Sequence, residues 1–199
     1  MSPADRVLLD DNTVRRENHT MARITRAALA TAGMVAALAG GTTTAHAAGA
    51  APAPVVETVQ FQLAHTGKCL DASPYTAGDQ TKVQQLSCNG SDAQKWRVVP
   101  AAESTFELRN VVSGRCLEVR RSQPQSGAEV WQWPCNGGKQ QRWTFGLLDP
   151  INKLYEIRPT HTGDQCLDIG HAQDTEGAAI WQWKCNQGIA QQWRILTVK

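Results

Sequence analysis

The six cysteines of this chain recur with a fixed spacing, and this period constrains the fold more than any other feature. They are Cys69, Cys88, Cys116, Cys135, Cys166 and Cys185. The two members of each successive pair are 19 residues apart, and the pairs begin 47 and then 50 residues apart. Trp96, Trp143 and Trp193 follow with the same separations of 47 and 50 residues. Such self-similarity indicates three tandem copies of one structural unit of about 47 residues.

Three short motifs recur at the same places in every repeat. Each of the three tryptophans is the last residue of a Gln-x-Trp triplet, and these triplets begin at Gln94, Gln141 and Gln191. Each first cysteine is followed by Leu and then by an acidic residue, which is Asp71, Glu118 or Asp168. Each second cysteine is followed by an asparagine, which is Asn89, Asn136 or Asn186. The repeats therefore share more than their cysteines.

Short alternating runs within the repeats predict an all-β fold. Residues 106–109 and 155–158 alternate apolar and polar side chains, and Gly67, Gly114 and Gly163 mark turns before the first cysteines. About four strands in each of the repeats, at about 59–100, 104–147 and 153–199, predict roughly twelve strands with pseudo-threefold symmetry. The three extra residues of the last period are expected near Asp149 and Pro150.

The repeat also limits how the cysteines can pair. Six cysteines can pair in fifteen ways, but only three patterns look the same in all repeats. Each first cysteine joins a second one, either in its own repeat or one or two repeats away, and the pairing within a repeat closes the shortest loops. Zinc is the alternative, but no two cysteines have the separation of two to four residues that zinc sites use. We therefore predict disulfides, and neither a metal nor a cofactor.

The segment before the repeats resembles an export signal. Residues 21–47 begin with Met, carry Arg23 and Arg26, continue with an apolar run and end in Ala-His-Ala, which is the pattern of a secretory signal peptide. We interpret residues 1–20 as a start-site overcall and residues 48–58 as a flexible linker. A twin-arginine signal at Arg15 and Arg16 is the alternative. A secreted, extracellular protein is predicted, and an even number of cysteines suits that oxidising environment.

The net charge and the length of the apolar runs argue against nucleic acids and membranes as partners. The whole chain has a formal net charge of +2, which is too small to indicate nucleic-acid binding. Its longest apolar run is shorter than the 20 or so residues needed to cross a membrane, so no membrane association is predicted. A monomer is expected.

The three Gln-x-Trp triplets, the three Cys-Leu-acid motifs and the matched cysteine spacing closely resemble the ricin-type lectin domain. That family has the β-trefoil fold and is also classed as carbohydrate-binding module family 13. The resemblance covers residues 59–199, and it implies one shallow sugar site in each repeat. It also implies that Trp96, Trp143 and Trp193 are structural and pack near the pseudo-threefold axis.

The resemblance assigns ligand positions to the acid after the first cysteine, to residues four and two before the second cysteine, and to the glutamine of the triplet together with the residue before it. That preceding residue is Ala190 in the third repeat, Gln140 in the second and Ala93 in the first. In the third repeat the other positions are Asp168, Trp181, Trp183 and Gln191. In the second repeat they are Glu118, Trp131, Trp133 and Gln141. In the first repeat they are Asp71, Gln84 and Gln94, with Leu86 in place of the aromatic residue. The sites are therefore expected to be unequal.

These residue types suit the chemistry of a sugar ring. An ionised carboxylate accepts several strong hydrogen bonds from hydroxyl groups, and an indole offers a flat apolar platform for the C–H face. Glu118 places its oxygens one methylene further out than an aspartate, and Leu86 has no ring. We therefore rank the sites third, second and first.

Other interpretations stay open from the sequence. The paired tryptophans could form a second packing layer, and the three acids could cap turns. His65, His161 and His171 are expected to be turn residues. The leading hypothesis is a non-catalytic lectin module that binds mono- or polysaccharides of the galactose, xylose or arabinose type. A protein-binding trefoil such as a protease inhibitor, or a small glycosidase, is the alternative.

Overall fold

The computed structural model describes residues 56–72 and 81–198, and within them six strands close a barrel. These strands are β1 (Glu57–Leu63), β5 (Trp96–Pro100), β6 (Phe106–Asn110), β9 (Arg142–Asp149), β10 (Leu154–Pro159) and β13 (Trp193–Thr197). Antiparallel pairing runs β1–β5–β6–β9–β10–β13 and returns to β1. Side chains of β1 alternate between buried and partly exposed, so Val59, Phe61 and Leu63 point into the barrel.

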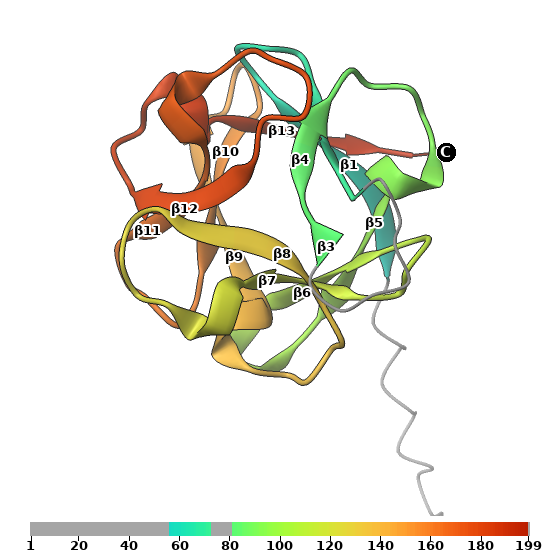
Figure 1. Cartoon of the computed structure of the whole chain (residues 1–199), viewed down its shortest axis with the longest axis vertical. Helices are drawn as coiled ribbons and strands as arrows, with labels where there is room; N and C mark the ends of the chain where they lie inside the picture. Colours follow the sequence, from blue (N-terminus) through green and yellow to red (C-terminus); the bar gives the residue numbers. More distant parts are fainter. Residues whose placement is uncertain (1–55, 73–80, 199) are drawn as a thin grey trace, which may run out of the picture. The chain divides into compact units, whose positions relative to one another are not determined.

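Three hairpins cover one end of the barrel, one from each repeat. They are β2 (Cys69–Asp71) with β4 (Gln84–Leu86), β7 (Cys116–Val119) with β8 (Ala128–Trp133), and β11 (Gln165–Ile169) with β12 (Ile180–Lys184). The hairpins join one another because β8 pairs with β12 and with the short β3 (Thr81–Lys82), while Gln84 bridges to Ala179. Figure 1 shows the three repeats around a common centre. This arrangement is a β-trefoil, as predicted.

The described residues contain thirteen strands, one more than the twelve expected. The extra strand arises in the first repeat, where β3 and β4 together correspond to β8 and to β12. The longer third period is accounted for by the β9–β10 hairpin, in which β9 has 8 residues and the register shifts between Leu154 and Tyr155. No helix of the described residues is long and apolar enough to cross a membrane.

Short 3-10 helices connect the strands. They are η1 (Asp92–Gln94), η2 (Ala102–Ser104), η3 (Arg120–Ser122), η4 (Lys139–Gln141), η5 (Gly170–Ala172) and η6 (Ile189–Gln191). Helices η1, η4 and η6 lead into the Gln-x-Trp tryptophans, whereas η3 and η5 follow the strands that carry Glu118 and Asp168. The acid after the first cysteine is thus flanked by the same elements in the second and third repeats.

The Gln-x-Trp tryptophans are structural, as the family resemblance implied. Trp96, Trp143 and Trp193 are fully buried in the core. Each indole N–H donates to the carbonyl of the leucine that follows the first cysteine, at 3.1, 3.0 and 3.1 Å. A buried indole needs such a partner for its polar atom. The same contact in three copies explains why this triplet and this Cys-Leu pair recur together.

Each disulfide lies within one repeat, so the shortest of the three symmetric pairings is confirmed. Cys69 joins Cys88, Cys116 joins Cys135, and Cys166 joins Cys185, with Cα–Cα distances of 5.1, 5.1 and 5.0 Å. Each bond ties the first strand of a cap hairpin to the residues just after its second strand. Closing a loop of this length stabilises the fold by about 3 kcal/mol on the chain-entropy model.

A periodic glutamine, not assigned a role from the sequence, links the repeats. Gln85, Gln132 and Gln182 are fully buried and lie on β4, β8 and β12. The amide of Gln182 donates to the carbonyls of Gln123 and Gln125 in the second repeat, at 2.7 and 2.9 Å. Gln132 donates in the same way to Ala72 of the first repeat, at 3.2 Å. Gln85 completes the cycle by donating to two carbonyls of the third repeat.

Candidate functional site

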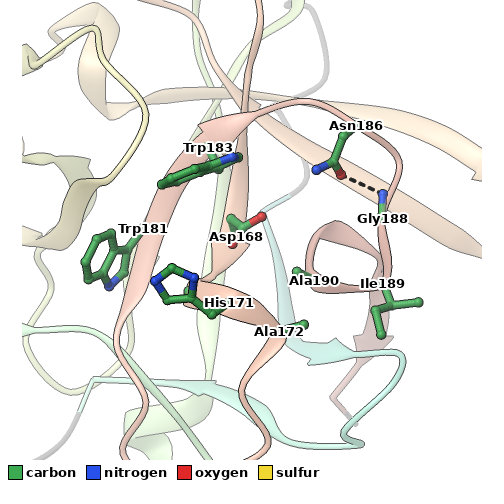
Figure 2. Close-up of a pocket in the computed structure, with 10 residues that line it drawn as sticks. Asp168, His171, Ala172, Trp181, Trp183, Asn186, Gly188, Ile189 and Ala190 are labelled. Atoms are coloured by element: carbon green, nitrogen blue, oxygen red, sulfur yellow. Dashed lines mark hydrogen bonds between the residues drawn. The ribbon is translucent and has the colours of Figure 1, made fainter.

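A pocket of about 320 Å³ lies on the third repeat, between the β11–β12 hairpin and the helices η5 and η6. It contains three of the four predicted ligand residues of that repeat, Asp168, Trp181 and Trp183. Figure 2 shows Asp168 at the centre of the pocket, with the two indoles and His171 to one side and Asn186 and Ile189 to the other. The cavity is at the small end of the range for ligand sites, which suits a ligand of about one sugar ring.

Asp168 supplies the acceptor at the base of the pocket. Its side chain is 5% exposed, and its Oδ2 accepts a 2.8 Å hydrogen bond from Nε2 of Gln191. Its other oxygen, Oδ1, has no hydrogen-bond partner among the described residues. Burial raises the pKa of Asp168 to about 6, against the opposing effects of the Gln191 hydrogen bond and of the nearby His171 and His65. At neutral pH the pocket therefore holds a carboxylate with one oxygen available to a ligand.

The two indoles share one face of β12 because the buried Gln182 separates them along the strand. Trp183 is 39% exposed, an unusual degree for so large an apolar side chain in this protein. The ring of His171 lies 6.5 Å from that of Trp183 at an angle of 55°. The pocket therefore has an exposed aromatic wall next to its carboxylate.

Gly127, in the second repeat, lies next to these indoles. A Cβ atom added to Gly127 would lie 3.5 Å from Trp181 and 3.5 Å from Trp183, which is an ordinary van der Waals distance. Its φ of +84° is also in the region that favours glycine. The amide of Gly127 donates to the carbonyl of Gln182 at 2.8 Å. The aromatic wall of the third repeat is thus supported by its neighbour.

Gln191 is held within the protein and positions Asp168. Its side chain is fully buried, and its Oε1 accepts from the amide of Asn186 at 2.9 Å. Its Nε2 donates to the carbonyl of Lys184 at 3.0 Å and to Asp168. Both donors of the amide group are therefore in use. Gln94 and Gln141 make the same contacts with the backbone of the residues on either side of the second cysteine and are equally buried.

The second repeat carries the same motif in a closed arrangement. Glu118 is 4% exposed, and both of its oxygens accept hydrogen bonds. One bond comes from Nε1 of Trp131 at 3.2 Å, and the other comes from Nε2 of Gln141. Trp131 is only 5% exposed and stacks on Trp133 with ring centres 5.5 Å apart. The indole thus occupies the acceptor that the third repeat leaves available.

Arg120 contributes to this closure. Its guanidinium lies 5.1 Å from the centre of the Trp131 ring and forms a 3.0 Å ion pair with Glu129. The corresponding position in the third repeat, 50 residues later, is Gly170, whose backbone lies beside the ring of Trp181. A bulky cation over the indole in one repeat and a glycine in the other is the clearest local difference between them.

The first repeat has the least developed site in the described residues. Asp71 is 1% exposed, and Gln84 and Leu86 on β4 are partly buried. Gln94 is fully buried. Tyr75, which could replace the missing aromatic residue, lies outside the described residues.

The sequence did not indicate several residues of the pocket. His171 was expected to be only a turn residue; it does lie in η5, with a φ of +58°, and it also lines the pocket. Asn186 forms the expected turn by accepting from the amide of Gly188 at 2.7 Å, and it too lines the pocket. Ile189 is a further lining residue. A comparison of the second and third repeats could have pointed to this pocket, because Gly170 and Ile189 stand where the second repeat has Arg120 and Lys139.

The sequence matches a known family along most of the described barrel. The profile of the family described as "ricin-type beta-trefoil lectin domain-like" matches residues 53–133 and 100–183. The chain belongs to this lectin family. No curated protein matches it in sequence.

Solved structures place this lectin domain among β-trefoils of several kinds. It is 30% identical to the designed threefold-symmetric protein ThreeFoil, with a TM-score of 0.67 over 71% of this chain and 99% of that one. It is 28% identical to the exo-β-1,3-galactanase 1,3Gal43A of Clostridium thermocellum, with a TM-score of 0.68 over 73% of this chain but 31% of that one. The fold is shared with a ricin B-like lectin of Macrolepiota procera in complex with lactose (18% identity, TM-score 0.60, 70% and 94% covered).

Proposed function

We propose that this lectin is exported and binds one sugar residue of a glycan in the third-repeat pocket, without catalysing a reaction. The observation that carries the proposal is the available Oδ1 of Asp168 beside the exposed indole of Trp183. The carboxylate would accept hydrogen bonds from two ring hydroxyls, and the indole would cover the C–H face. Such a small open site is expected to bind at about millimolar Kd.

Galactose-type glycans are the best-supported class among the galactose, xylose and arabinose types. The support is the 28% identity to part of an exo-β-1,3-galactanase, together with the shared fold of a lectin solved with lactose. Export is supported by the signal-like residues 21–47 and by three disulfides, which persist in oxidising compartments. Membership of carbohydrate-binding module family 13 and a monomeric state remain predictions.

The absence of catalysis is proposed from the number of carboxylates in the pocket. Glycoside hydrolysis uses two carboxyl groups roughly 5–10 Å apart. Among the described residues that line the pocket, Asp168 is the one with a carboxylate. One carboxylate can orient a hydroxyl group but cannot serve as both acid and base on opposite sides of a glycosidic bond.

A glycan array probed with the purified protein tests the proposal, with a reducing-sugar assay on galactan and xylan alongside it. We expect binding to galactose-terminated glycans and no release of reducing ends. Binding to no glycan would refute the lectin function. Steady release of reducing sugars would refute the non-catalytic part.

Binding should weaken in acid, because the acceptor must be ionised. The pKa of Asp168 is raised to about 6, so the carboxylate takes up a proton as the pH falls through that value and loses its negative charge. We expect the association constant, measured by isothermal titration calorimetry, to fall about tenfold between pH 8 and pH 5. Circular dichroism at each pH controls for unfolding. An association constant that does not change with pH would show that sugar binding does not depend on the charge of Asp168.

The closed second repeat should contribute little to binding. Both oxygens of Glu118 are engaged by Trp131 and Gln141, so Glu118→Gln removes a charge that no ligand reaches. We expect the Kd to change by less than about twofold, the scale of a few tenths of a kcal/mol. Calorimetry should also fit one site per chain. A tenfold loss of affinity in Glu118→Gln, or a wild-type stoichiometry of two that falls to one in this variant, would show that the second repeat opens and binds.

A further inference from the structure

One wall of the third-repeat pocket is aliphatic. Ala172 from η5 and Ile189 and Ala190 from η6 line the pocket, and η5 and η6 contact each other. Figure 2 shows these three residues on the side away from Trp181 and Trp183. Ile189 is 55% exposed and does not belong to the hydrophobic core, whereas Ala190 packs partly against it. Ile189 is therefore the exposed residue of this wall, and Ala172 and Ala190 are partly buried.

The second repeat shows that this wall is not required by the fold. The positions 50 residues earlier are Ser122, Lys139 and Gln140, all of them polar, in the equivalent helices η3 and η4. Helices η5 and η6 of the third repeat thus both carry aliphatic residues where the second repeat has polar ones. The third repeat is also the one with the open pocket. Ile189 differs from the exposed Ile151 in that it lines the pocket.

The side chains of this wall offer neither a donor nor an acceptor. A sugar hydroxyl placed against them would lose its hydrogen bonds to water without replacement, which is unfavourable. A methyl group in the same place would instead remove apolar surface from water on both sides. Asp168, at the base of the pocket, would still hold the hydroxyls of the same ring.

We propose that the wall formed by Ala172, Ile189 and Ala190 makes the pocket selective for sugar residues that carry a methyl group. This inference rests on the proposed lectin function and specifies its ligand. The methyl group can belong to an acetamido substituent or to a 6-deoxy sugar, and both present the same chemistry to the wall.

The test compares three sugars that differ by one substituent. Galactose, N-acetylgalactosamine and 6-deoxygalactose are titrated into the purified protein and into its Ile189→Ser variant, and the Kd values are measured by NMR or calorimetry. We expect the wild type to bind at least one methyl-bearing sugar about fourfold more tightly than galactose, the effect of one buried methyl group. Ile189→Ser should reduce this ratio to about one, because the hydroxymethyl side chain offers the methyl group much less apolar surface.

Ile151→Ser is the matched control, since Ile151 is 89% exposed in the β9–β10 turn and does not line the pocket. It should keep the wild-type ratio. The acetamido and 6-deoxy arms show which source of the methyl group the wall prefers. Equal affinity of the wild type for all three sugars, or a ratio unchanged in Ile189→Ser, would overturn the proposed wall and leave the lectin function standing. If none of the three sugars binds but the glycan array is positive, the test uses glycans from the array instead. The Kd of a bound glycan with a methyl group is then compared with the Kd of one that carries only hydroxyl groups, in the wild type and in Ile189→Ser.

Discussion

Replacing Asp168 with asparagine is expected to abolish glycan binding and, at the same time, to stabilise the folded protein at neutral pH. The binding loss follows from the loss of the charged acceptor, because charge-assisted hydrogen bonds are about twice as strong as neutral ones. At a starting Kd near the millimolar range, a loss of about 2–3 kcal/mol places binding below detection. Calorimetry with the best glycan of the array measures this effect.

The gain in stability follows from the raised pKa. The pKa of Asp168 is about 6 in the folded protein, above the ordinary value of 3.8 for an aspartate, so the folded state binds the proton more readily than the unfolded chain. The cost of burying the charge is therefore absent below about pH 4 and fully present above about pH 6. Asp168→Asn removes this cost and should raise the free energy of unfolding by about 1–3 kcal/mol at pH 7.5.

Urea unfolding at about pH 7.5 and at about pH 4 measures the stability effect, which should vanish at the lower pH because the native aspartate is then neutral. Asp149→Asn is the opposite control. Hydrogen bonds from Asn152 lower the pKa of the exposed Asp149, so its replacement should not stabilise the protein. Retained binding in Asp168→Asn would show that the carboxylate is not the ligand acceptor, and an unchanged stability would show that its burial carries no cost.

Two tryptophans on consecutive strands of the third repeat, Trp193 on β13 and Trp183 on β12, should respond to alanine in opposite ways. Trp193 is fully buried, and its indole donates to the carbonyl of Leu167 at 3.1 Å. Trp193→Ala removes a core side chain and leaves a cavity, which costs about 3–5 kcal/mol. This is a large part of the roughly 5–15 kcal/mol that keeps a domain folded. We expect a loss of more than about 10 °C in Tm for a domain of this size.

Trp183→Ala should instead remove binding with little loss of stability. Trp183 is 39% exposed, so truncation removes less buried surface and opens no closed cavity. The aromatic platform for the sugar would be lost, and we expect the Kd to rise at least about tenfold with a change in Tm of only a few degrees. Thermal unfolding and calorimetry on both variants separate the two roles. Normal binding by Trp183→Ala would place the platform elsewhere, and an unchanged Tm of Trp193→Ala would contradict its place in the core.

The scaffold was predictable from the sequence because its contacts recur in every copy. A cysteine pair, a Cys-Leu step and a Gln-x-Trp triplet at one spacing reflect a local unit whose disulfide and Trp-to-Leu hydrogen bond form within a single repeat. The three buried glutamines Gln85, Gln132 and Gln182 recur just as regularly, but they bond to the carbonyls of a neighbouring repeat. Their spacing could be recognised from the sequence, whereas their partners could not.

The sequence by itself therefore determined the threefold β-trefoil scaffold and the set of residues from which a sugar site could be built. Only the tertiary structure decided which copy of that set is open. Trp131 and Trp181 stand at equivalent positions, yet the first closes over Glu118 beneath Arg120, while the second lies against Gly127 of the neighbouring repeat. The direction in which an indole turns depends on what packs against it from other segments, and a motif read within one repeat does not contain those contacts.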